Sequence, residues 1–154
     1  MKGYPKWFFS CLMTIFTILV LSGCLLIPTV FDLKLEWSTP WRLAEGMHVW
    51  VAGLHALLSF ITLAIIGALW AVHMRLGWRR RKNHRSGLTL VSILLILLAT
   101  AIGVYYTGDE YLTVVVSVLH VIFGVIAPVV IGYHIWSGRR QAKIAHQEAE
   151  RHRH

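Results

Sequence analysis

Five histidines lie inside long apolar segments of this 154-residue chain, and they fall in only two of those segments: His48, His55, His73, His120 and His134. An ionisable side chain within a hydrocarbon layer is costly, so each one needs a partner. Neutral imidazole is also the commonest metal ligand among protein side chains. These histidines are therefore the first candidates for binding a metal ion or a cofactor.

The spacing places each set of histidines on one face of a helix that turns 100° per residue. His48 precedes His55 by seven residues, and His73 follows His55 by eighteen residues, which is five whole turns. His120 and His134 are fourteen residues apart, within about 40° of four full turns. We therefore expect one histidine stripe on each of two helices.

Four uninterrupted apolar runs must supply these helices, and none contains Asp, Glu, Lys or Arg: residues 7–31, 47–74, 87–106 and 112–136. A helix of about 20 residues crosses a hydrocarbon core of about 30 Å. Within lipid each run must satisfy its own backbone groups, which predicts a helix. The sequence thus predicts an all-α membrane protein, with a four-helix up-down bundle in residues 1–140. The charged tail, residues 141–154, is expected as a short surface helix or a disordered segment.

The net charge of +8 raises nucleic acid as a partner, but the distribution of basic residues has another explanation. Thirteen of the fifteen Lys and Arg residues lie in the N-terminus, the loop after the second run and the C-terminal tail. The positive-inside rule places all three regions, and so both termini, in the cytoplasm. The expected partner is the lipid bilayer, with no nucleic acid.

The first run contains a possible processing signal. Leu21-Ser22-Gly23-Cys24 resembles a bacterial lipoprotein cleavage box. The chain stays apolar as far as Phe31, which places Cys24 inside the span rather than at its exit. We therefore expect the run to be retained as the first span.

Histidines on the second and fourth spans pair by depth, because those two spans run in the same direction in an up-down bundle. His55 matches His120 near the outer leaflet, and His73 matches His134 near the cytoplasmic leaflet. Two facing imidazoles suit bis-histidine ligation of a haem iron. The sequence therefore predicts haem in two layers, or in one. His48, whose neighbours resemble those of His120, is the alternative outer ligand, or a contact for a haem propionate or a quinone.

An internal repeat supports this pairing. His73 and His134 are each followed by three residues, a glycine and then paired arginines, which suggests a duplicated helical hairpin. Arg79 and Arg139 are candidates to hold haem propionates, although topological anchoring explains them equally well. Small residues near the histidines could make room for a cofactor or orient a ligand ring: Ser59, Thr62, Gly124, Ala127, Gly23 and Gly103.

The four spans, with histidines fourteen apart from Leu119-His120 to Tyr133-His134, resemble the small membrane cytochromes b. This group includes bacterial cytochrome b561 and the cytochrome subunits of formate dehydrogenase and nickel-iron hydrogenase. The resemblance implies that His120 and His134 each ligate a different b haem. It also implies a bacterial inner membrane, electron exchange with a quinone pool and a separate redox subunit. The chain would then be an electron-transfer subunit of an oxidoreductase, with no catalytic residue of its own. An oligomer of this chain is possible.

This chain departs from that group in one respect. Its members commonly use a histidine on the first span, and this chain has none there. The expectation is a divergent arrangement in which the second and fourth spans supply all four ligands.

Two other functions can use histidines within spans. A membrane scaffold or assembly subunit would need them only for hydrogen bonds between helices, and five histidines on two matched stripes count against it. A haem or metal transporter could also use histidine layers. Transporters of protons or cations usually add carboxylates within the membrane, and these spans contain none.

Overall fold

Four helices and no strand make up the part of the chain that the structure, a computed structural model, describes: residues 5–70, 74–75, 77 and 83–152. The helices are α1 (Lys6–Leu35), α2 (Glu45–Leu69), α4 (His84–Tyr106) and α5 (Glu110–Arg151). Each one is long and apolar enough to cross a membrane. The predicted all-α, four-helix fold of a multi-pass membrane protein is confirmed.

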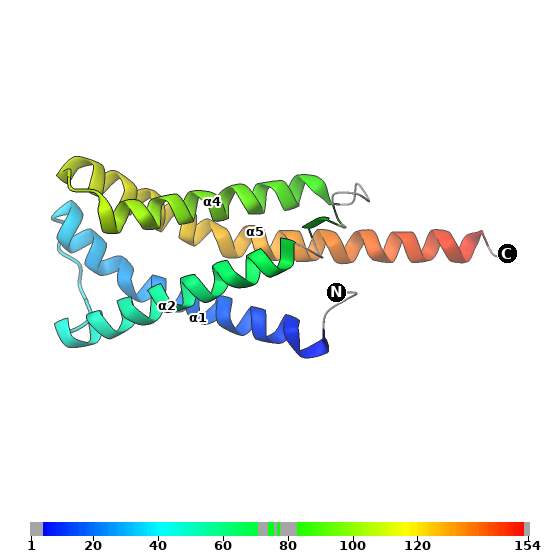
Figure 1. The fold of residues 1–154 in the computed structure, drawn as a ribbon, viewed down its shortest axis with the longest axis horizontal. Helices are drawn as coiled ribbons and strands as arrows, with labels where there is room; N and C mark the ends of the chain where they lie inside the picture. The colour runs from blue at the N-terminus through cyan, green and yellow to red at the C-terminus, as the bar shows by residue number, and fades with distance from the viewer. Residues whose placement is uncertain (1–4, 71–73, 76, 78–82, 153–154) are drawn as a thin grey trace.

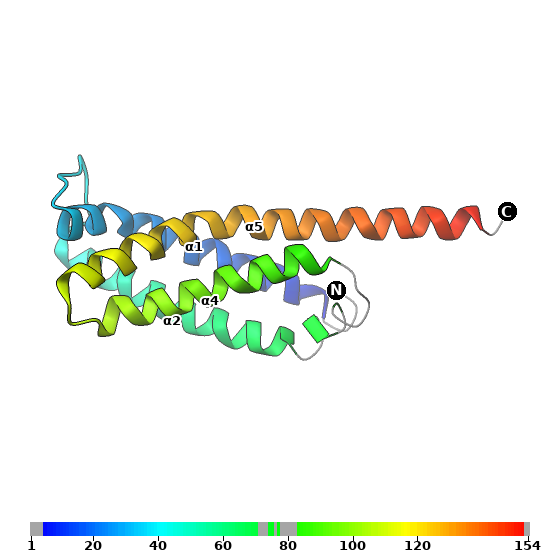
Figure 2. The ribbon, with the colours of Figure 1, turned by 90° about the horizontal axis from the view of Figure 1, so that it is seen from above.

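The helices run alternately up and down as two hairpins lying side by side (Figures 1 and 2). α1 packs on α2, α4 packs on α5, and α1 also packs on α5, so that α1 and α5 join the two hairpins. We call the end with the α1–α2 and α4–α5 connections the hairpin end. The opposite end, where α1 and α4 begin, is the terminal end.

The bundle is apolar outside and partly polar inside. Large apolar side chains point outward, and Trp50 is 82% exposed, Phe60 71% and Val129 72%. Five of the ten buried residues in the described part of the chain carry a hydroxyl: Ser22, Thr62, Ser86, Thr100 and Ser117. Because lipid tails solvate apolar groups as well as a protein core does, only polar groups gain by turning inward.

The predicted spans and the observed helices differ at the C-terminal end. The fourth run was expected to end at residue 136, but α5 continues without a break to Arg151 and projects beyond the bundle (Figure 2). The segment after Gly138 contains no Gly or Pro and is rich in Ala, Glu, Gln, Lys and Arg, which are strong helix formers. His146 Nδ1 also lies 3.3 Å from Glu150 Oε1, one turn further on. The tail is therefore helical and continuous with the last span.

Polar side chains fix the connections at the hairpin end. Asp109 precedes α5, and its side chain accepts a hydrogen bond of 2.7 Å from the Leu112 amide, which caps the helix. Arg42 forms an ion pair of 2.6 Å with Asp32 across the α1–α2 connection. These contacts hold each hairpin in register at the end where its two helices meet.

Close helix approach in the second hairpin depends on a glycine, as the sequence suggested. A Cβ added to Gly103 of α4 would lie 3.1–3.3 Å from three side-chain carbons of Val116 on α5. Val116 is β-branched, so its χ1 angle has little freedom within a helix. The neighbouring side chain therefore has little room to move aside.

We expect Gly103→Leu to lower the free energy of unfolding by about 1–3 kcal/mol, because it overpacks this contact. Gly53→Leu is the matched control, since a Cβ at Gly53 would meet nothing within 4 Å. Thermal unfolding in a mild detergent, followed by circular dichroism, measures both variants. Equal stability of the two variants would show that the α4–α5 contact tolerates a side chain at position 103.

Candidate metal or cofactor site between the hairpins

Two histidines from different hairpins lie face to edge in the interior. The rings of His55 on α2 and His120 on α5 have centroids 6.4 Å apart, and their planes are inclined by 85°. The depth pairing expected from the spacing is therefore present in the geometry. His48 lies two turns earlier on α2, is half-buried and has no partner of this kind among the described residues.

The ring of His55 is held by α1. Its Nδ1 lies 3.0 Å from the Ser22 hydroxyl and 3.1 Å from the Leu19 carbonyl oxygen. A carbonyl oxygen can only accept a hydrogen bond, so Nδ1 of His55 carries the proton and donates it. The Ser22 hydroxyl donates its own proton to Leu19 O at 2.9 Å, which leaves its lone pairs to accept from His55.

The ring of His120 is held in the same way by α4. Its Nδ1 lies 3.0 Å from the Thr100 hydroxyl. That hydroxyl donates to the backbone carbonyls of Ile96 at 2.8 Å and Leu97 at 3.1 Å, so it too accepts from the imidazole. Leu97 stands three residues before Thr100, as Leu19 stands three residues before Ser22. The two hairpins thus repeat one local arrangement.

A third histidine repeats the arrangement near the terminal end. Nδ1 of His134 lies 3.0 Å from the Ser86 hydroxyl, which donates to the carbonyl of Asn83 at 3.3 Å. The Asn83 side-chain amide donates in turn to the carbonyl of His134 at 3.2 Å, and its oxygen accepts from Ser137 at 2.7 Å. Asn83 adopts a left-handed backbone conformation, with φ of 57°. It joins the start of α4 to α5 beside this histidine.

Protonation at Nδ1 has a chemical consequence, because a neutral imidazole then keeps its lone pair on Nε2. No hydrogen bond to Nε2 of His55 or His120 comes from the residues that the structure describes. A histidine whose Nδ1–H is held by a second group while its Nε2 is available is the usual state of a metal ligand. The pair is thus suited to donate two nitrogen lone pairs.

Small residues allow the rings to come close to the neighbouring helix. A Cβ added to Gly23 would lie 3.0 Å from Cε1 of His55, and one added to Gly87 would lie 3.7 Å from Cε1 of His134. Each glycine directly follows the hydroxyl residue that holds the ring, Ser22 or Ser86. The close approach expected at Gly23 is therefore present, and it is made to a histidine ring.

The other predicted site residues are not part of the contact between His55 and His120, or fall outside the part of the chain that the structure describes. His73 and Arg79 fall outside the described residues. Arg139 is exposed on α5. Ser59 was expected to orient a ligand ring, but its hydroxyl donates to the backbone oxygen of His55 at 2.7 Å, as serines in helices often do. Thr62 is buried, and its hydroxyl has no hydrogen-bond partner among the described residues.

Sequence reasoning missed the three hydroxyl residues on α1 and α4, because those helices carry no histidine within their apolar runs. A signal was nevertheless present. Each hydroxyl is followed by a small residue: Ser22-Gly23, Ser86-Gly87 and Thr100-Ala101. Ser86 and Thr100 are also fourteen residues apart, the same spacing as that of His120 and His134 on the antiparallel partner. Equal spacing on two adjacent antiparallel helices predicts two matched contacts.

The hydrogen bonds predict the tautomer of the interior histidines. Nitrogen-15 NMR of histidine-labelled protein in detergent should show Nδ1 protonated in His55 and His120 when no metal or cofactor is bound. Ser22→Ala and Thr100→Val assign the two signals, because each variant alters one ring's environment. Protonation at Nε2 in the unmodified protein would contradict the proposed direction of these hydrogen bonds.

The chemistry open to this pair is limited by the donors around it. No group of three or more His, Cys, Asp or Glu side chains that could hold a metal ion occurs among the described residues, so what those residues offer is a two-nitrogen site. Structural zinc sites use four protein ligands, whereas a haem supplies four nitrogens of its own and needs two axial ligands. Comparison of the chain with family models, curated proteins and solved structures finds no match.

Proposed function

We propose that this chain is a b-type cytochrome that carries electrons across the membrane, and that His55 and His120 are the axial ligands of one haem. The distance between these two rings carries the proposal. Two imidazoles would hold one metal ion through nitrogen bonds of about 2.0–2.1 Å, so they must come from rings that lie close together. The centroids of His55 and His120 are 6.4 Å apart.

Three further features of the site fit an axial pair. The Nδ1 atoms of both rings are occupied by hydroxyl groups, which fixes the rings and leaves Nε2 as the donor. The two ligands come from different hairpins, as in other cofactor sites built into helical bundles. The buried hydroxyl of Thr62, two turns after His55, is available to bind a polar group of a cofactor.

A second haem is proposed at His134. Its Nδ1 is held by Ser86 in the arrangement that Ser22 and Thr100 give to the outer pair. The partner expected from the sequence is His73, with Arg79 and Arg139 as the cations that would bind propionates. When bound, haem supplies reversible one-electron chemistry, and the residues of the chain hold and orient it.

The distribution of charge suggests how the chain is oriented in its membrane. In the sequence, basic residues are concentrated before α1, between α2 and α4 and in the tail, which favours a cytoplasmic location for both termini. We propose a bacterial inner membrane, with electrons passing between a quinone pool and a separate redox subunit. The described residues outside the bundle are short connections and the helical tail.

A scaffold function without a cofactor remains the second candidate, and one observation favours it. The bonds from histidine to hydroxyl tie α1 to α2 and α4 to α5, and such bonds by themselves stabilise helix pairs in membranes. In that function the T-shaped contact of His55 with His120, which are joined by no hydrogen bond in the described structure, would serve only as packing between the hairpins.

The deciding experiment is a pyridine haemochrome assay on protein purified after expression with ample haem. We expect His55→Ala and His120→Ala each to remove one and the same haem, because either change removes an axial ligand. His134→Ala should remove the other haem. His48→Ala is the matched control on α2 and should retain both. Purified wild-type protein without haem would refute the proposal, and haem loss in the His48 variant alone would move the outer ligand to that residue.

The hydroxyl groups should tune this site without binding iron. We expect Ser22→Ala and Thr100→Val to weaken haem binding by about 10- to 100-fold, the usual effect of removing a group that orients a metal-bound histidine. Ser59→Ala is the control, because that hydroxyl bonds only to the backbone of its own helix. Haem titration followed by the Soret band measures all three. Equal affinities in the three variants would show that the hydroxyls have only a packing role.

A further inference from the structure

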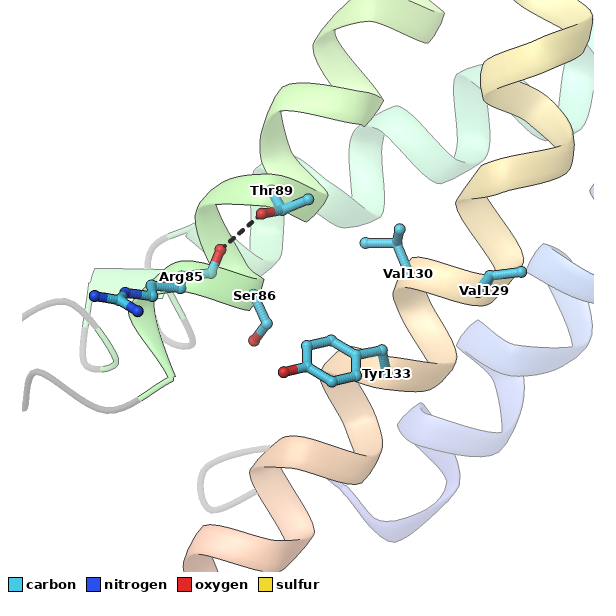
Figure 3. A pocket seen from close by; sticks show the side chains of 6 residues that line it. All are labelled: Arg85, Ser86, Thr89, Val129, Val130 and Tyr133. Carbon is cyan, nitrogen blue, oxygen red and sulfur yellow. Dashed lines mark hydrogen bonds between the residues drawn. The ribbon is translucent and has the colours of Figure 1, made fainter.

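A groove opens on the lipid-facing side of the second hairpin, near the terminal end. Its volume is about 340 Å³, and α4 and α5 line it with Arg85, Ser86, Thr89, Val129, Val130 and Tyr133 (Figure 3). Its floor includes the buried Ser86, and its rim includes Val129 and Tyr133, which are 72% and 56% exposed. The groove is thus open on the outer surface of the second hairpin.

The positive charge at this groove has no counter-ion in the described structure. The described ion pairs join other residues, and Arg85 takes part in none of them. All seven acidic residues of the chain lie at or before residue 45, at 109–110, or at 148 and beyond. The intervening segments, which form the walls of the groove, contain none. A negative charge beside Arg85 must therefore come from another molecule.

Aromatic residues place the groove at the level of lipid head groups. The ring of Tyr133 lies 6.0 Å from that of Trp136, and the guanidinium of Arg140 lies 5.5 Å from the Trp136 ring centroid. Tyrosine and tryptophan gather where the hydrocarbon core meets water, and arginine prefers the same boundary. A lipid phosphate is at this depth, whereas a deeper groove would meet only acyl chains.

Two polar groups of the lining are available to a ligand. The Arg85 guanidinium extends away from the valines and Tyr133 in Figure 3, so this long, exposed side chain must turn toward the groove to take part. The Thr89 hydroxyl already donates to the Arg85 carbonyl at 2.9 Å, and the Ser86 hydroxyl is bonded to His134. The Arg85 guanidinium and the Tyr133 phenol have no hydrogen bond within the described residues, and both donate. Val129 and Val130 supply an apolar wall beside them.

We propose that this groove is a binding site for an anionic phospholipid. The lipid phosphate accepts hydrogen bonds from Arg85 and Tyr133, and an acyl chain packs on Val129. Arginine binds phosphate through a planar array of donors, which makes the site selective for an exposed phosphate charge. The lipid site does not depend on haem, so it can be tested independently of the proposed cytochrome function.

The test uses the full chain in a neutral detergent, with phosphatidylglycerol or phosphatidylcholine added and retained lipid counted by native mass spectrometry. We expect phosphatidylglycerol to be retained about tenfold better than phosphatidylcholine, and Arg85→Gln to remove that preference. Tyr133→Phe should weaken retention to a smaller extent. Lys143→Gln is the matched control, because it removes one positive charge from α5 outside the groove, and it should behave as the wild type.

A second variant tests the groove itself. Val129→Trp keeps every charge but fills the space, and it should also lose phosphatidylglycerol. An equal loss in Lys143→Gln would overturn the proposal in favour of diffuse attraction to the basic end. Equal retention of both lipids, or displacement of phosphatidylglycerol by inorganic phosphate at equal concentration, would also overturn it. Haem-free protein that still retains the lipid would support it.

Discussion

The interior of this protein depends on a hydrogen bond from a histidine Nδ1–H to a hydroxyl group on the neighbouring helix. In water such a bond is easily exchanged, but the centre of a bilayer offers no competing partner. Each hydroxyl also donates to a backbone carbonyl three or four residues earlier in the chain, so it can only accept from the imidazole. This order of donation sets the direction of the rings of His55, His120 and His134, and the ring direction sets what the site can bind.

The same bond explains how the helices are divided between two tasks. α2 and α5 carry the interior imidazoles, while α1 and α4 carry the hydroxyls that hold them and the glycines that let them approach. The helices without interior histidines are therefore more than packing walls. They set the tautomer and position of the rings, which is the control that a second group normally exerts on a metal ligand.

The two hairpins build this arrangement from similar parts. A leucine carbonyl and a hydroxyl three residues later, Leu19 with Ser22 and Leu97 with Thr100, accompany the facing pair His55 and His120. The sequence suggested duplication from the histidine–glycine–arginine pattern at the terminal end. The structure adds a second similarity between the hairpins, beside His55 and His120. It lies in how the side chains are arranged in space, and no shared sequence motif marks it. A duplicated hairpin readily brings two similar side chains together from opposite sides of a bundle.

The sequence alone determined the number of spans, their helical state and the faces that carry the histidines, because hydrocarbon thickness and backbone hydrogen bonding leave no other solution. It also favoured His55 as the residue at the depth of His120 and left His48 as the alternative. It did not determine the partners of Nδ1. Ser22, Ser86 and Thr100 are ordinary residues of apolar helices until packing brings them within 3.0 Å of a ring. The sequence also left the conformation of the tail undecided, since its composition suits a helix in water as well as disorder. Only the tertiary structure decided these points, because a hydrogen bond between helices depends on rotation and tilt, which the hydrophobic pattern of one helix does not specify.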